Sequence, residues 1–282
     1  MHPSLRETAN RITEHLGIRH KEIPTFGVES IKEIDGKYRL HVELATTGFF
    51  LPLVHLNFPG VDEAAIGWFD PNPEKNPQID EAATTMMAEM LKKMRPKVVV
   101  MTNSTKSENF IQEAVKKLPK GTRLIILPSG SEAEKRDDVT DRSSGQLIEY
   151  TPVTGTKKLM GYPKKVEGQV DYLTLEELQK LCPHGKGLVI ADDVYTTGET
   201  IRAMEKILGL KEEDKHQVAV IAIEKQYDAQ DGKYRDKKIP KNVHAVFNLT
   251  EFLGLDYLLD RNKLHIYDKP NIPPAIVENY KQ

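Results

Sequence analysis

Short apolar runs alternate with segments of helical periodicity through the middle of this chain of 282 residues. Residues 97–101 (KVVVM) and 124–127 (LIIL) have the length and composition of buried strands, and residues 187–191, 217–223 and 243–247 repeat the pattern. A short connection returns the chain to a parallel neighbour only through a crossover helix, so this alternation predicts a parallel sheet covered on both faces. We therefore expect an α/β fold.

The helical segments carry start and stop signals. Asp80 is a candidate cap for a helix that ends before Pro96, because the residue before proline avoids the helical region. Ser107 is a candidate cap for the next helix, with Gly121 as its stop. Two further helices are expected after Thr174, which forms a capping box with Glu177, and over residues 199–208.

Three regions are predicted. Residues 1–75 form an N-terminal lobe with strand-like pieces at 38–44 and 49–56, residues 76–255 form the core, and residues 256–282 form a tail that wraps the surface or a partner subunit. Between Ser129 and Lys165 no periodicity is visible, and we expect a mobile functional loop there.

Charge and cysteine content exclude several classes of protein. Lys+Arg (40) nearly balances Asp+Glu (42), so no nucleic-acid partner is expected, and no apolar stretch is long enough for a membrane span. Cys182 is the single cysteine, which excludes an intrachain disulfide, and Cys182-Pro183-His184 has no metal-ligand partners at suitable spacing. We expect a cytoplasmic protein.

The segment 187–201 (GLVIADDVYTTGETI) carries the chemistry. An apolar strand leads into Asp192 and Asp193, followed by a turn rich in hydroxyl groups and glycine, and then by a helix. The first peptide N–H groups of a helix are unpaired and lie at the positive end of its dipole, so they suit a phosphate. The paired carboxylates suit the vicinal hydroxyls of a ribose, with a hydrated divalent cation alongside. The alternative is an ordinary turn with solvated aspartates and Thr197 as a helix cap.

This ordered run resembles the phosphoribosyl pyrophosphate motif of type I phosphoribosyltransferases. The resemblance implies a type I phosphoribosyltransferase-like parallel sheet flanked by helices, in which the N-terminal lobe contributes to a small hood. It also implies that Asp192 and Asp193 hold the ribose hydroxyls and reach Mg²⁺ indirectly, through substrate and water. The 5-phosphate would be wrapped by Tyr195, Thr196, Thr197, Gly198, Glu199 and Thr200, and Val194 would be a further substrate-binding residue. Glu199 departs from the small residue often found at its position.

The same resemblance assigns two further segments. The pyrophosphate loop would be Asn103-Ser104-Thr105-Lys106, which follows a predicted strand and precedes a helix, so a plain helix cap is the alternative. The mobile loop would supply Lys157 and Lys158 to the diphosphate, and a solvated basic pair is the alternative there. The implied catalytic residues are Asp192, Asp193 and Lys106.

The acceptor base is less constrained by the sequence. Residues 221–225 (IAIEK), the turn 231–235 (DGKYR) and the returning run 243–249 resemble adenine and xanthine phosphoribosyltransferases, although the spacing is longer. Thr196 stands where hypoxanthine-guanine enzymes usually carry an acid, which disfavours an aspartate-assisted mechanism. The expectation is a Mg²⁺-dependent homodimeric purine phosphoribosyltransferase whose substrates are phosphoribosyl pyrophosphate and a nucleobase. A pyrimidine or other base as acceptor, or a catalytically silent regulator that binds phosphoribosyl pyrophosphate, are the alternatives.

Overall fold

The computed structural model describes residues 23–44, 47–56, 64–102, 107–127, 158–160, 172–235, 238–254 and 258–266. In these parts of the chain the helices are α2 (Pro77–Met94), α3 (Glu108–Lys116), α5 (Leu175–Leu181) and α6 (Glu199–Ile207), with short 3-10 turns η1 (Val28–Ser30), η2 (Pro183–Gly185) and η4 (Arg261–Lys263). The strands are β1 (Thr25–Phe26), β2 (Ile31–Ile34), β3 (Lys37–Leu44), β4 (Thr47–Leu56), β5 (Ala64–Gly67), β6 (Val98–Thr102), β7 (Arg123–Leu127), β8 (Lys158–Met160), β9 (Tyr172–Thr174), β10 (Leu188–Tyr195), β11 (Gln217–Asp228), β12 (Lys233–Tyr234), β13 (Val243–Leu253) and β14 (His265–Ile266).

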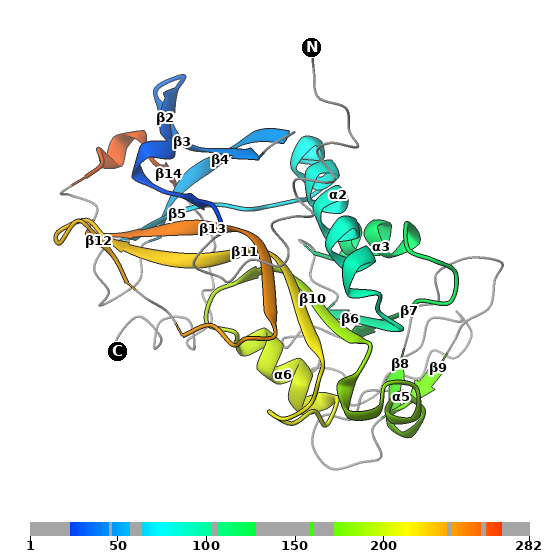
Figure 1. Cartoon of the computed structure of the whole chain (residues 1–282). Helices are drawn as coiled ribbons and strands as arrows, with labels where there is room; N and C mark the ends of the chain where they lie inside the picture. The colour runs from blue at the N-terminus through cyan, green and yellow to red at the C-terminus, as the bar shows by residue number, and fades with distance from the viewer. Residues whose placement is uncertain are drawn as a thin grey trace, which may run out of the picture.

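One large sheet runs through the molecule in the order β2-β3-β4-β5-β13-β11-β10-β6-β7 (Figure 1). The strands β7, β6, β10, β11 and β13 are parallel to one another. Helices lie in the connections of this parallel part, so the predicted α/β class, with parallel strands flanked by helices, is confirmed.

Helices cover both faces of the parallel strands. Side chains of α2 and α3 pack with Val99 and Met101 of β6 on one face, whereas α5 and α6 pack with Val98 and Val100 on the other. Successive side chains of a strand point to opposite faces, so a strand buried on both sides must be apolar at every position. This requirement explains the uninterrupted apolar runs of the sequence.

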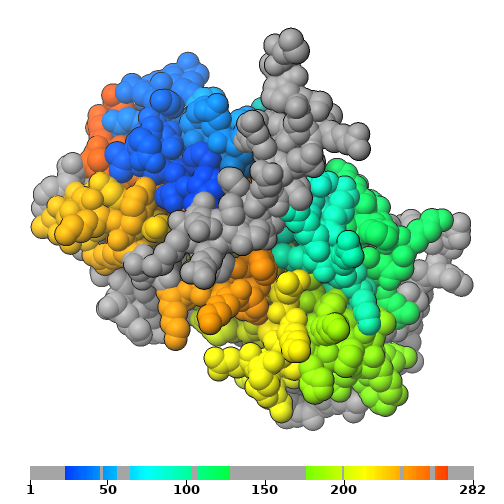
Figure 2. All heavy atoms as spheres, viewed as in Figure 1, coloured from blue at the N-terminus to red at the C-terminus, as the bar shows by residue number. Residues whose placement is uncertain are grey.

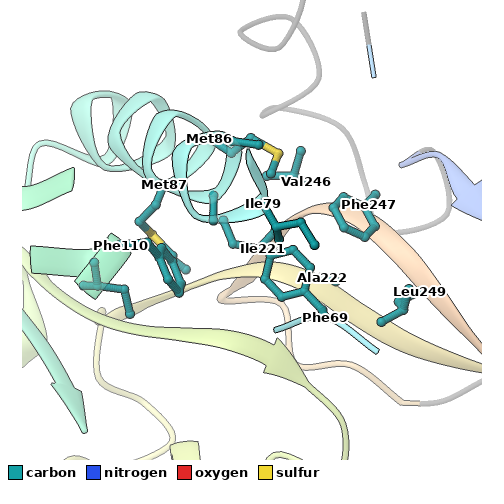
Figure 3. Packing of buried hydrophobic residues seen from close by; sticks show 14 of the residues in the cluster. Phe69, Ile79, Met86, Met87, Phe110, Ile221, Ala222, Val246, Phe247 and Leu249 are labelled. Carbon is teal, nitrogen blue, oxygen red and sulfur yellow. The ribbon is translucent and has the colours of Figure 1, made fainter. Parts of the chain in front are cut away.

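The N-terminal lobe is an antiparallel extension of the same sheet. Strand β13 pairs with β5, β5 with β4, β4 with β3 and β3 with β2, all antiparallel. The centroid of the Phe247 ring of β13 lies 5.6–6.4 Å from the centroids of the Phe26, Phe49 and Phe69 rings, and Figure 3 shows it beside Phe69. Phe49 and Phe69 therefore belong to the core.

The described part of the tail lies on this lobe. Strand β14 pairs with β4, Lys263 forms an ion pair with Glu33 of β2, and Figure 2 shows residues 258–266 (orange-red) against the lobe strands (blue). The predicted boundaries at residues 75 and 255 remain predictions. Strands β4 and β5 continue the sheet from the region before the first boundary into the core.

Three adjacent strands bend together without changing register. Between β10 and β11, Asp192 pairs with Val220 and Val194 with Ala222, whereas Asp193, which lies between them, is not paired with a residue of β11. Between β11 and β13 the same gap falls at Ile221 and Val246. On both strands two consecutive residues then pack into the same cluster beneath α2, namely Ile221 with Ala222 and Val246 with Phe247 (Figure 3). The alternation of faces is thus interrupted by a shared bend rather than by an inserted residue.

Several predicted element boundaries were wrong. Helix α2 begins at Pro77 after Asn76, because proline at the first helical position needs no hydrogen-bond partner for its nitrogen. Asp80 therefore lies in the first turn, where both of its carboxylate oxygens accept hydrogen bonds of 3.0 Å from Asn109 Nδ2. Helix α3 ends at Lys116, before the predicted stop at Gly121.

The strands are longer than the apolar runs that predicted them. Strand β10 continues through both aspartates to Tyr195, β11 to Asp228 and β13 to Leu253. Of the loop expected between Ser129 and Lys165, the structure describes only β8, which pairs antiparallel with β9. The rest of that loop lies outside the described residues. Among the helices that the structure describes, none is long and apolar enough to cross a bilayer.

Truncating Phe247 should destabilise the whole sheet, because this buried ring joins the helix-covered core to the lobe. We expect Phe247→Ala to lower the free energy of unfolding by roughly 3–5 kcal/mol, the usual cost for a buried aromatic side chain. Phe50→Ala removes a ring that is 39% exposed and should cost much less. Urea unfolding of both variants tests this expectation. Equal losses in the free energy of unfolding would contradict a hydrophobic core that is shared between the helix-covered strands and the lobe.

Candidate functional site

The predicted site lies where the strand order of the sheet reverses. Along the chain the parallel strands follow as β6, β7, β10, β11 and β13, but in the sheet β7 and β10 lie on opposite sides of β6. In open α/β sheets, ligands bind outside the carboxyl ends of the strands at such a switch point, where neighbouring connections leave in opposite directions. Here the switch point lies between β6 and β10, and the aspartates belong to β10.

The segment after β6 leaves the sheet at the same edge. Val99 pairs with Val189 and Val100 with Ile190, so in this register Thr102 at the end of β6 stands level with Asp192. Residues 103–106, predicted as the pyrophosphate loop, begin immediately after Thr102 and themselves lie outside the described residues. The backbone therefore starts both predicted loops from adjacent positions at one edge.

The two aspartates bond to the backbone that follows them. Asp192 Oδ1 accepts a hydrogen bond of 3.0 Å from the N–H of Asp193, and Asp193 Oδ1 accepts one of 2.9 Å from the N–H of Val194. Aspartate side chains compete in this way with the regular hydrogen bonds of secondary structure, and the gap in pairing falls at Asp193. Asp192 is buried and Asp193 is half-buried, so the carboxylate of Asp193 is the more accessible to a ligand.

The turn after β10 exposes hydroxyl groups above a buried glycine. Gly198 precedes α6 with φ 78° and ψ 11°, a left-handed conformation that glycine adopts without steric cost. Thr196, Thr197 and Thr200 are exposed. The first N–H groups of α6 have no partner within the helix, so backbone donors and threonine side chains lie together at one corner of the sheet. An anion is the ligand that this corner suits.

Tyr195 supports the turn from below. Its ring is buried in the same cluster as Ile201 and Met204 of α6, and a β-carbon added to Gly198 would lie 2.6 Å from Tyr195 Cζ. Burial raises the pKa of the Tyr195 phenol, while the charge of Arg202 acts to lower it. The structure thus places the Tyr195 side chain beneath the turn, and the half-buried Val194 packs against the cluster on the opposite face of the sheet.

Other predicted residues are not brought together by the described structure. Lys157, and the side chains of Lys158 and Glu199, lie outside the described residues. The backbone of Lys158 belongs to β8, which contacts β7, and β6 separates β7 from β10. The contacts proposed for these residues and for Asn103, Ser104, Thr105 and Lys106 therefore stay predictions.

Arg202 was not singled out from the sequence, yet it contacts the turn directly. Its Nη1 donates a hydrogen bond of 2.9 Å to the carbonyl oxygen of Thr197, and its side chain is exposed. Long side chains on a helix lean toward its N-terminus, so an arginine in the second turn can reach the residues before the helix. This direction of helical side chains was the signal in the sequence that could have identified Arg202.

The region compared with adenine and xanthine enzymes forms a short hairpin. Tyr227 pairs with Tyr234 between β11 and β12, their rings lie 5.0 Å apart, and Lys225 Nζ lies 5.1 Å from the centroid of the Tyr234 ring. Asp228 binds Arg235 across the hairpin and also accepts a hydrogen bond from the N–H of Gln230. These contacts fix the shape of the turn.

A magnesium ion beside Asp192 and Asp193 would need ligands beyond the described residues. Among the described residues, no group of three or more His, Cys, Asp or Glu side chains is arranged to hold a metal ion. Mg²⁺ commonly binds through one or two carboxylates, with the remaining positions filled by substrate phosphates and water. The adjacent carboxylates of Asp192 and Asp193 fit that kind of site.

No family model matches this chain, and no curated protein sequence matches it. Its fold has likenesses among solved structures. A purine phosphoribosyltransferase from Pyrococcus horikoshii is 14% identical with a TM-score of 0.29, covering 69% of this chain and 93% of that one. A hypoxanthine phosphoribosyltransferase from Staphylococcus aureus is 14% identical with a TM-score of 0.30, covering 70% and 90%. A hypothetical protein from Neisseria gonorrhoeae with bound ppGpp is 11% identical with a TM-score of 0.33, covering 72% and 91%.

Replacing Gly198 should damage the turn more than replacing a glycine of similar backbone conformation elsewhere. Gly36 has φ 73° and no atom within 4 Å of an added β-carbon, so Gly36→Ala incurs only the left-handed backbone cost of roughly 1–2 kcal/mol. Gly198→Ala incurs this cost and also a collision with Tyr195. Urea unfolding should show the larger loss for Gly198→Ala, and similar losses would mean that the ring does not support the turn.

The stability of the hairpin should depend on pH through Asp228. The hydrogen bond from Arg235 is the main cause that lowers the pKa of Asp228 below its usual 3.8. Because the pKa of Asp228 is lower in the folded state, its contribution to the free energy of unfolding is fully present above the pKa of the unfolded state. That contribution is lost as pH falls through the pKa of the folded state. Asp228→Asn should therefore reduce stability to urea near neutral pH, and the difference from wild type should shrink below about pH 3.8. An Arg235→Gln background should largely remove that pH dependence, whereas an unchanged profile would refute the assignment.

Proposed function

We propose that this chain is a phosphoribosyltransferase that moves ribose 5-phosphate from phosphoribosyl pyrophosphate to a nucleobase, with Mg²⁺ as cofactor and a purine as the favoured acceptor. The observation that carries the proposal is the turn between β10 and α6. It sits at the switch point of a parallel sheet and joins two carboxylates to a helix N-terminus with exposed threonines. This short segment carries both carboxylates and hydrogen-bond donors that suit an anion. The two kinds of group match a phosphorylated sugar, whose hydroxyl groups donate hydrogen bonds and whose phosphate accepts them.

In this reaction a ring nitrogen of the base forms a bond to the anomeric carbon while the bond from that carbon to the diphosphate oxygen breaks, and the proton of the nitrogen is released to water. Positive charge grows on the ribose ring, and negative charge grows on the leaving group. Asp192 and Asp193 would hold the 2- and 3-hydroxyls and face the developing positive charge, and the turn with Thr196, Thr197 and Thr200 would hold the 5-phosphate. Magnesium, when bound, would offset negative charge on the diphosphate. Lys106 would act on the same diphosphate from the segment that follows β6.

The choice of a purine rests on the hairpin that follows β11. Residues 221–225 lie in β11, which continues into the hairpin with β12, and residues 243–249 lie in β13, parallel to β11. These are the segments that resemble adenine and xanthine enzymes. Thr196 is exposed in the turn and stands where hypoxanthine-guanine enzymes usually carry an acid. A proton-transferring acid at this position is therefore not part of the proposed mechanism.

A direct test combines binding with a panel of acceptors. Purified full-length protein is titrated with phosphoribosyl pyrophosphate in the presence and absence of Mg²⁺, and product formation is then assayed with adenine, hypoxanthine, guanine, xanthine, uracil and orotate. Product from a purine supports the proposal, and product from a pyrimidine alone corrects the acceptor. Binding without product from any of these bases would favour a ligand-binding regulator. Absence of binding would overturn the assignment of the site.

The aspartates supply the matched mutational prediction. A hydrogen bond to a charged group contributes roughly 1.5–3 kcal/mol, so Asp193→Asn should raise the KM for phosphoribosyl pyrophosphate by roughly tenfold or more. Asp192→Asn should act at least as strongly, and its thermal midpoint must be measured because Asp192 is buried. Glu213→Gln, which removes an exposed carboxylate in the connection after α6, is the control and should leave the kinetics unchanged. Wild-type kinetics in both aspartate variants would remove their assigned role.

A further inference from the structure

The outer face of the lobe sheet, the face turned away from the hydrophobic core, carries basic and aromatic side chains. Leu40 of β3 is buried in the core, and successive side chains of a strand point to opposite faces. The neighbours of Leu40, Arg39 and His41, therefore lie on the outer face, together with their cross-strand partners Pro52 and Phe50. This face belongs to the lobe and is separate from the turn between β10 and α6.

The described part of the tail brings a further basic group to the outer face. Where the pairing of β4 with β3 ends, β14 pairs with β4 instead, and His265 lies opposite Val54, two positions after the outer-face proline (Figure 1). Lys37, at the start of β3, donates hydrogen bonds of 2.9 Å to the carbonyl oxygens of Asn262 and Leu264. These bonds hold β14 beside the start of β3. Lys37, Arg39 and His265 form the lobe basic cluster.

The described contacts leave this cluster without a compensating anion. Within the described part of the chain, neither Arg39 Nε nor His265 Nε2 has a hydrogen-bond partner, although both atoms are buried. The two hydrogen bonds of Lys37 Nζ go to neutral carbonyl oxygens, which do not offset its charge. An unpaired buried polar atom is unfavourable, and a negatively charged ligand with several acceptor oxygens would relieve it.

The charges of the cluster act on one another. Burial is the main cause that lowers the pKa of His265 below its usual 6.5, and the charges of Arg39 and Lys37 lower it further. The three groups are therefore close enough to interact electrostatically. Glu33 of the neighbouring strand β2 forms an ion pair with Lys263 instead. An anion at the cluster would reverse the unfavourable effect of the two positive charges on the imidazole.

An exposed aromatic ring lies on the same face. Phe50 is 39% exposed, and its ring stacks on His41 with 4.5 Å between the centroids and 18° between the ring planes. Phe50 precedes Val54 by four residues along β4, which is about 13 Å at the rise of a strand. A nucleotide carries a flat base and phosphate groups at the two ends of one molecule. Aromatic rings hold bases by stacking, and basic side chains hold phosphates.

We propose that the outer face of the lobe is a second binding site, which takes a nucleoside diphosphate with its phosphates at the lobe basic cluster and its base on the Phe50 ring. Lys32 of β2 pairs with Arg39 and adds an exposed positive charge on the same face. The site uses no residue of the turn between β10 and α6, so it goes beyond the proposed function and does not depend on it.

The test follows the imidazole signals of full-length protein labelled with ¹⁵N-histidine. ADP, inorganic diphosphate and adenosine are added separately, and NMR spectra are recorded, with His265→Gln to assign the signal. ADP should shift the signals of His265 and His41. It should also raise the pKa of His265, because its phosphates offset the charges of Arg39 and Lys37. His216, buried at the start of β11, is the internal control, and its signal should not move.

Substitutions separate the two halves of the site. Arg39→Ala should weaken ADP binding, read from the His265 signal, by roughly tenfold or more, and Arg39→Lys should retain part of the affinity because it keeps the charge. Phe50→Ala should weaken ADP binding by roughly tenfold but leave the affinity for diphosphate within about twofold of wild type. Lys116→Ala removes an exposed cation of α3 and is the control, with both affinities unchanged.

Several outcomes would overturn the proposal. One is a His265 signal that does not respond to millimolar ADP, and another is an equal loss of affinity for Lys116→Ala. Binding of single-stranded oligoadenylate without binding of ADP would also reject it, since the face would then hold a nucleic acid. ADP binding that depends on Arg39 and Phe50 supports the site, whether or not the chain forms product from any base.

Discussion

The pairing of β11 with β13 is the interaction on which the remainder of the structure depends. These long strands stay in one register from Val218 to Asp228, so the same backbone ladder carries the helix-covered parallel part and the antiparallel lobe. On one side β11 holds β10 and its aspartates, and on the other β13 holds β5. The site and the lobe are therefore positioned by one continuous set of main-chain hydrogen bonds.

The chemistry of the site follows from how β10 ends. Asp192 and Asp193 bond to the N–H groups that follow them, and the regular pairing of the strand is interrupted at that point. The chain then turns through Gly198, whose left-handed backbone directs it into α6 above the buried Tyr195 ring. Each feature is local, but their order along the segment places the carboxylate acceptors and the hydrogen-bond donors of the turn together at the carboxyl end of β10. A ligand that is both a polyol and an anion satisfies both groups.

The sequence predicted the helices and strands whose apolar residues follow a regular period. It failed to predict strand ends that depend on contacts with segments distant in the chain. Apolar runs located β6 and β10, and helical spacing located α6, because burial on two faces or on one stripe leaves a clear pattern. The same runs ended β11 and β13 too early, since their polar ends are satisfied only by other strands. Gln226 Nε2 donates a hydrogen bond to Glu251 Oε2 between β11 and β13, and Glu251 also pairs with Ile66 of β5 in the lobe. Arg202 was missed because its contact depends on side-chain direction, which no motif records.

The shared bend at Asp193, Ile221 and Val246 leaves the register of three neighbouring strands intact, and this continuity limits how the molecule can move. Hinged domains open about a few connecting residues, whereas here the boundary between core and lobe is itself a hydrogen-bonded ladder. Swinging the lobe away from the switch point would require breaking that ladder. The sheet thus holds the ends of β6 and β10 at fixed positions relative to the lobe.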